Sequence, residues 1–240
     1  MKYLKKFNEE LSPMTYRRAA AKILSKNIKN PALKKRYKSL IDHSDDIRHK
    51  MSLVEWKDCI EKFSKYGLIN VISECESGTI QENFYFDLCF EKECMVDSYN
   101  SEGDEIDFPF FIGLIPPNQD VLDKCLEIFP ETDFSNGFFW GFCLSINLKI
   151  VGDEYIFNNI TLDPYDEGLT GNIYLSNRRG ALTIKNALIE AFSKNYPSGY
   201  KSHEYTKQVI EETIDELNMS HEAFDVALDG IEKFDGNKLL

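Results

Sequence analysis

The longest hydrophobic alternation in the chain, FFWGFCLSINLKIV at residues 138–151, restricts its fold more than any other feature. Ser145, Asn147 and Lys149 occupy much of one face, as expected for a half-buried β-strand. The other face carries Trp140, Phe142, Leu144, Ile146, Leu148 and Ile150. Gly152-Asp153 then forms a turn into EYIFNNITLDPY. We expect a hairpin whose first strand is central in an antiparallel sheet.

The strand after this turn should continue the inward face with three apolar side chains, Ile156, Ile160 and Leu162. Before the hairpin, short aromatic and β-branched runs alternate with Gly, Asn, Ser and acidic residues, which is typical of further strands. These runs cover residues 68–76, 82–93, 94–99 and 106–115, and GNIYL at 171–175 adds a last strand. VLDKCLEIF at 121–129 has helical spacing, so a single helix interrupts the strands.

Helices are predicted on both sides of this sheet region. Ser12-Pro13 and Asn30-Pro31 each combine an N-cap residue with proline at the first helical position. Ser52 and Glu55 form a capping box, and Gly67 stands where a helix-ending glycine is expected. Further helical stripes begin near residues 178, 203 and 220, the first including Leu182, Ala187 and Leu188. The predicted class is α+β: N-terminal helices, an antiparallel sheet with one inserted helix, and C-terminal helices.

Charge is distributed unevenly along the chain, whose net charge is −12. Residues 1–66 hold 17 Lys and Arg against 8 Asp and Glu, a net charge of +9, whereas residues 67–240 hold 11 against 32, a net charge of −21. We therefore divide the chain into a basic helical head (1–66) and an acidic α+β body (67–240). The two segments either serve different partners or are two solvated faces.

The predicted docking surface of the basic head consists of Lys34, Lys35, Arg36 and Lys38. Its expected partner is an acidic protein surface, including the body of another copy of this chain. Nucleic acid is the weaker alternative, because no aromatic platform accompanies these residues and the acidic body repels a polyanion. No apolar run approaches the roughly 20 residues needed to span a bilayer, so we expect no membrane partner.

The sequence offers no metal site or cofactor site. The six cysteines form no C-x-x-C pair and lie in apolar or alternating stretches, which favours a reducing cytoplasm. Cys89 and Cys94 should point to opposite faces of one strand. His43 and His49 lie beside acidic residues, but a solvated turn explains them better than a metal site. Phosphate-loop, dinucleotide-binding, zincin and nucleophile-elbow motifs are absent from the sequence, which disfavours an enzyme.

Two adjacent arginines at a strand-to-helix junction form the candidate anion-binding site, which comprises Asn177, Arg178 and Arg179. The free N–H groups and the dipole of a helix N-terminus favour negative charge. The alternative role of the arginines is to pair with the acidic residues of the body. If the chain is an enzyme with an unrecognised site, the residues to test are Asp163, Asp166, Arg178 and Arg179.

Two stretches carry a resemblance to known proteins. MKYLKKFNEELSPMTYRRAAAKIL and IYLSNRRGALTIKNALIEAFSKNYPSGY resemble segments of proteins of unassigned role in large tailed bacteriophages of Bacteroidota, including the crAss-like group. The resemblance implies a phage product found in the virion or in the cytoplasm of the infected bacterium. It also implies a capsid-associated, cargo or head–tail connector protein, whose partners are other virion proteins or copies of itself.

The sequence thus favours a non-enzymatic phage structural or virion-associated protein that acts through protein–protein contacts. The first alternative is a host-takeover or anti-defence protein that binds a host factor or nucleic acid. The second alternative is the enzyme with an unrecognised site.

Overall fold

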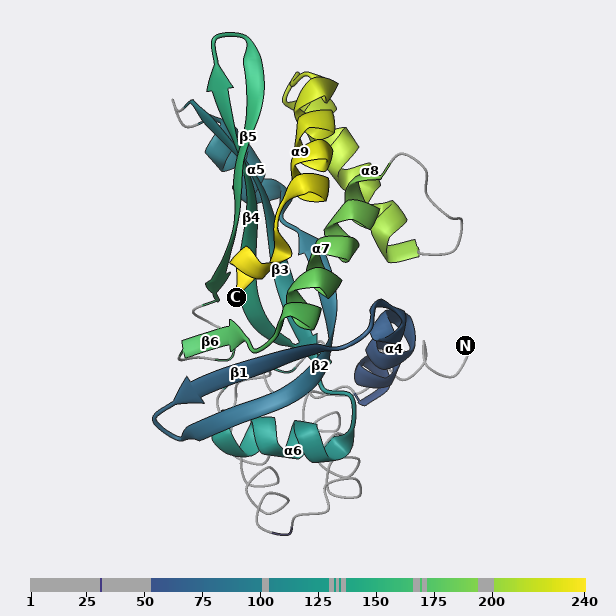
Figure 1. Ribbon diagram of the computed structural model, residues 1–240. Helices are drawn as coiled ribbons and strands as arrows, with labels where there is room; N and C mark the ends of the chain where they lie inside the picture. The colour runs from purple at the N-terminus through teal and green to yellow at the C-terminus, as the bar shows by residue number, and fades with distance from the viewer. Residues whose placement is uncertain are drawn as a thin grey trace, which may run out of the picture.

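The chain forms a six-stranded antiparallel sheet with helices before, between and after the strands (Figure 1). A computed structural model describes residues 31, 53–100, 104–129, 132, 134, 137–165, 169, 172–193 and 201–240. The strand order is β5-β4-β3-β2-β1-β6. The strands are β1 (Ile69–Cys75), β2 (Gly78–Phe90), β3 (Glu105–Ile115), β4 (Phe139–Val151), β5 (Glu154–Pro164) and β6 (Asn172–Leu175). The predicted α+β class is confirmed.

Three C-terminal helices, α7, α8 and α9, lie on one side of the sheet (Figure 1). Phe192 at the end of α7 joins the layers, because its ring contacts Phe108 and Phe110 of β3 and stacks on Phe224 of α9. The helices are α4 (Leu53–Phe63), α5 (Lys92–Asn100), α6 (Gln119–Ile128), α7 (Arg178–Phe192), α8 (Lys201–Glu216) and α9 (His221–Lys233). Short 3-10 helices, η2 (Ser64–Tyr66) and η3 (Gly236–Leu239), follow α4 and α9.

Strand β2 has different neighbours along its length. Residues 78–84 pair with β1, whereas residues 85–90 pair with β3 on the opposite edge. The β1–β2 hairpin consequently runs across the lower part of the molecule, while β3, β4 and β5 run lengthwise (Figure 1). Within the described residues, no strand pairs with residues 85–90 on the side that β1 has left.

Helix α4 begins and ends close to the predicted positions. Its side chain Trp56 is buried, and the indole Nε1 donates to the carbonyl oxygen of Pro116 at 2.7 Å. Gly67 ends the helical segment with a φ of +88°, a left-handed value that glycine adopts without strain. The earlier predicted helices lie outside the described residues apart from Pro31, which is helical. The division into residues 1–66 and 67–240 therefore stays a prediction.

One predicted strand is wrong. Residues 94–99, expected as a strand, lie in helix α5, so two helices rather than one are inserted among the strands. Alternation alone does not separate these cases in so short an apolar run. Cys89 accordingly lies on β2 and Cys94 on α5, not on opposite faces of a single strand.

Three side chains do not lie on the predicted inner face. Trp140 pairs with Gly113 at a register shift, which reverses the alternation of β4. The Trp140 ring therefore lies on the face opposite to the predicted one, where it contacts the ring of Phe111. A second shift at Asn147 and Leu148 leaves Ile156 of β5 exposed. Leu182 of α7 is also exposed. The other predicted inward residues of the hairpin are buried or packed against the core.

Helix α9 approaches β5 closely at Gly230. A Cβ atom at this position would lie only 2.0 Å from Cδ2 of Phe157. Alanine normally stabilises a helix interior by about 1 kcal/mol relative to glycine. Here the steric overlap should reverse that sign.

We expect Gly230→Ala to lower the free energy of unfolding by about 1–3 kcal/mol, because the overpacked ring or helix must shift. Chemical denaturation measures this change. Glu232→Ala, an exposed substitution in the same helix, serves as the control and should change the free energy by less than about 0.5 kcal/mol. A stabilised Gly230→Ala protein would contradict the close helix–strand contact.

Candidate functional site

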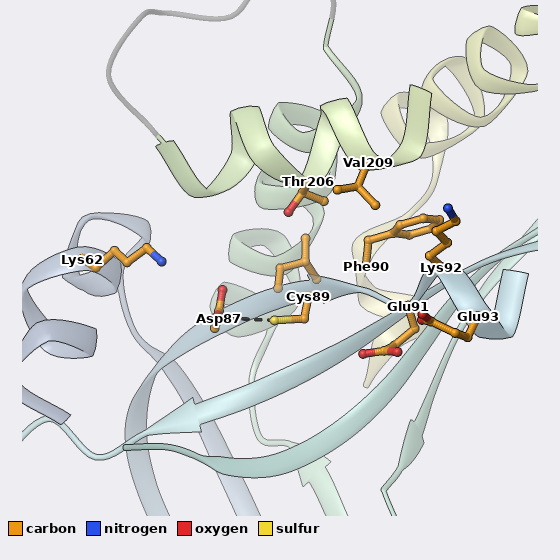
Figure 2. A pocket seen from close by; sticks show the side chains of 10 residues that line it. Lys62, Asp87, Cys89, Phe90, Glu91, Lys92, Glu93, Thr206 and Val209 are labelled. Atoms are coloured by element: carbon orange, nitrogen blue, oxygen red, sulfur yellow. Dashed lines mark hydrogen bonds between the residues drawn. The ribbon is translucent and has the colours of Figure 1, made fainter. Parts of the chain in front are cut away.

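A candidate site in the described part of the chain is a pocket of about 670 Å³ beside the second half of β2 (Figure 2). Lys62 of α4 lies at one end, and Thr206 and Val209 of α8 form a wall. Residues 87–90 of β2 and 91–93 at the start of α5 complete the lining. The volume lies within the range of roughly 300–1,000 Å³ that is usual for ligand sites.

Backbone groups of β2 face this pocket. The N–H of Glu91 donates to the carbonyl oxygen of Pro109 at 3.0 Å and so points toward β3, whereas the carbonyl oxygen of Glu91 accepts from the N–H of Met95 in α5. Hydrogen bonding alternates along an antiparallel strand, so the backbone N–H and C=O groups of Asp87 and Cys89 also point toward β3. The peptide groups of Leu88 and Phe90 therefore point to the unpaired edge.

Three titratable groups on the outer face of β2 are perturbed. Burial raises the pKa of Asp87, although the Lys62 charge, the Cys89 thiol and the Leu88 N–H oppose this shift. Burial, followed by the nearby Asp87 carboxyl, raises the pKa of the Cys89 thiol, whose Sγ lies 3.5 Å from Oδ2 of Asp87. Burial also raises the pKa of Glu91, and the charge of Glu93 adds to this.

These shifts define what the pocket can do chemically. A thiol with a raised pKa stays protonated near neutral pH and is a poor nucleophile. The carboxyl of Asp87 is a buried acceptor that gains from a cationic partner. Lys62 does not fill that role by contact: its Nζ lies 4.8 Å above the centre of the Phe63 ring, and no ion pair with Asp87 is formed. The site is therefore suited to binding a cationic group.

The structure places Asn177 at the N-cap of α7, where its Oδ1 accepts from the N–H of Gly180 at 3.0 Å. Its Nδ2 donates to Oγ of Ser176, which itself donates to Oδ1 of Asn70 on β1. Asn70 also donates to Asn83 of β2 at 3.0 Å. This network fixes the passage of the chain from β6 into α7, so the amide of Asn177 has a structural role.

Arg178 and Arg179 begin α7, and both are exposed. No carboxylate in the described ranges forms an ion pair with either of them. Arg179 and Asn177 line a smaller pocket of about 390 Å³ together with Asn70, Asn83 and Tyr85. The anion site stays a prediction.

The other predicted site residues are dispersed or undescribed. Asp163 is exposed on β5, and no hydrogen bond or ion pair joins it to the two arginines within the described residues. Asp166 and the predicted docking residues Lys34, Lys35, Arg36 and Lys38 lie outside the described residues. Among the residues that are described, no group of three or more His, Cys, Asp and Glu side chains could hold a metal ion.

Sequence reasoning did not single out Asp87 or Lys62, and it considered Cys89 only together with Cys94. The sequence feature that could have indicated this site is an acidic residue within the aromatic run NFYFDLCF, where Asp87 interrupts alternating large apolar residues. The position of this acid next to an unpaired edge depends on the strand order and could not be read from that run.

Comparisons with protein-family models, with curated proteins and with solved structures give no match to this chain. A separate finding is that no helix in the described ranges has the length and apolar character required to cross a membrane.

The unpaired edge predicts an alternation in amide exchange along β2. We expect the amide proton of Phe90, and less strongly that of Leu88, whose N–H contacts the Asp87 carboxyl, to exchange with solvent faster than those of Cys89 and Glu91, since only the latter pair bonds to β3. Residue-resolved hydrogen exchange measures this. Equal protection of all four amides would show that the edge is closed.

The N-terminus of α7 provides a second prediction. Asn177→Ala should lower the free energy of unfolding by about 1 kcal/mol, because the cap of α7 is lost. The double variant Arg178→Ala and Arg179→Ala should change it by less than about 0.5 kcal/mol, because both side chains are exposed. Thermal or chemical denaturation compares them, and a clearly destabilised double variant would show that the arginines are structural.

Proposed function

We propose that this protein acts without catalysis, by binding another protein at the pocket between α4, β2 and α8. The observation that carries the proposal is the half of β2 that no described strand pairs on the pocket side, where the backbone groups of Leu88 and Phe90 border the pocket. Unpaired strand edges are templates for association with another chain, and proteins usually cover or blunt them. This edge is instead bordered by a pocket large enough for a ligand.

The chemistry of the pocket supports binding over reaction. The raised pKa of the Cys89 thiol keeps it protonated, and the Asp87 carboxyl accepts its weak hydrogen bond. The residues to test for the enzyme alternative are Asp163, Asp166, Arg178 and Arg179. No hydrogen bond or ion pair in the described ranges joins Asp163 to either arginine, and Asp166 lies outside the described residues.

We assign the protein to the virion-associated class on the basis of the resemblance of its opening segment and its NRRGAL segment to tailed-phage proteins. The bound partner is then another virion protein or a second copy of this chain. The host-takeover alternative uses the same pocket but a host protein as its partner.

A photo-crosslinking experiment tests the proposal. Replacing Val209 by benzoylphenylalanine puts the reactive group in the pocket wall, and illumination during infection should give a covalent adduct with one particle protein. The matched control carries the same residue at Gln208, which is exposed on α8 and outside the pocket.

The position-209 adduct should be found in purified particles by mass spectrometry, and the position-208 protein should not form it. An adduct with a host protein, together with absence from particles, would replace the virion role by the host-takeover role. If position 209 gives no adduct beyond those of position 208, the pocket is not a protein-binding site.

A further inference from the structure

We propose that the partner adds a β-strand to the unpaired edge of β2 and presents an Arg or Lys side chain to Asp87. This inference rests on the proposed function, because it specifies how the pocket of Figure 2 is occupied. The partner chemistry is an extended basic peptide segment.

The backbone of β2 supplies the first part of the argument. A strand added to a sheet lies about 4.8 Å from its neighbour and exchanges N–H and C=O bonds with every second residue. At this edge the residues that line the pocket with outward-pointing peptide groups are Leu88 and Phe90, whose Cα atoms lie about 7 Å apart along the strand. Among the described residues no backbone group bonds to them from the pocket side, and the Leu88 N–H interacts with the carboxyl of Asp87.

The two walls of the pocket determine the side-chain pattern of the added strand. Side chains of neighbouring strands that lie opposite each other share a face. On the inner face the incoming side chains meet Leu88, Phe90 and Val209, which are apolar. On the outer face they meet Asp87 and Glu91. A segment that alternates apolar and basic residues matches both faces.

Charge favours a basic segment over an acidic one. Burial raises the pKa of the Asp87 carboxyl, and the Lys62 charge, the Cys89 thiol and the Leu88 N–H oppose this shift, but Lys62 forms no ion pair with the carboxyl. Lys92 does not compensate it, because its ammonium group pairs with Glu216 of α8. An incoming cation opposite Asp87 supplies the missing countercharge. The net charge of −12 also raises the rate at which basic segments approach.

The probe is a synthetic ten-residue peptide of alternating valine and arginine, whose binding to the full chain is followed by fluorescence anisotropy. We expect the peptide to bind, and Asp87→Asn to weaken its binding about tenfold or more. The matched control is Asp163→Asn, which makes the same change in net charge on β5 and should leave the affinity unchanged within about twofold. Equal effects of the two variants would overturn the role of Asp87.

A second pair of peptides tests the backbone. N-methylation of every second residue on the edge that faces β2 keeps the charges but removes the N–H donors, and it should abolish binding. A methylated peptide that still binds would show general attraction to an acidic protein and would overturn strand addition. Replacing arginine by glutamate in the peptide should also abolish binding.

The outcomes separate this inference from the proposed function. A specific crosslink at position 209 without binding of the arginine peptide retains the protein-binding function and overturns strand addition by a basic segment. If Val209→Arg abolishes binding of the arginine peptide and Gln208→Arg does not, the result supports both the protein-binding function and strand addition. A peptide that binds equally to both variants overturns the pocket as its site.

Discussion

The pairing of β2 on two different edges is the constraint on which the rest of the structure depends. Within the six-stranded sheet, its first half pairs with β1, which also pairs with β6, and its second half pairs with β3, which continues into β4 and β5. Phe84 and Phe86 lie at the change of partner and are fully buried. Helices α4 and α8 both contact β2, and residues of both line the pocket beside its second half.

The helical layer is held to this sheet mainly by large apolar contacts. Phe192 connects α7 with β3 and α9, while Phe157 connects β5 with Phe234 beyond the end of α9. Lys185 of α7 donates to the carbonyl oxygens of Glu232 and Phe234, which satisfies acceptors left free where α9 ends. These contacts set the position of α7, against which α8 packs as the wall of the pocket.

Periodicity in the sequence predicts the elements well where local spacing decides the structure. The hairpin around Gly152, the α6 stripe and the end of the α4–η2 helical segment at Gly67 follow from it. It fails at Trp140 and Ile156, where bulges reverse the alternation, and at α5, where a short apolar run fits either structure. The candidate site could not be predicted from the sequence. An unpaired edge depends on the order of the strands in the sheet, and this order is set by pairings between residues far apart in the chain.

The position of β6 has a consequence for the order of folding. Its four residues pair with β1, so Val71 meets Leu175 across about one hundred intervening residues. Closing so long a loop costs conformational entropy that a four-residue strand repays only when its surroundings are already formed. The β1–β2 and β4–β5 hairpins join neighbouring residues and form without that cost. β6 therefore docks late, and its docking brings the start of α7 onto β1.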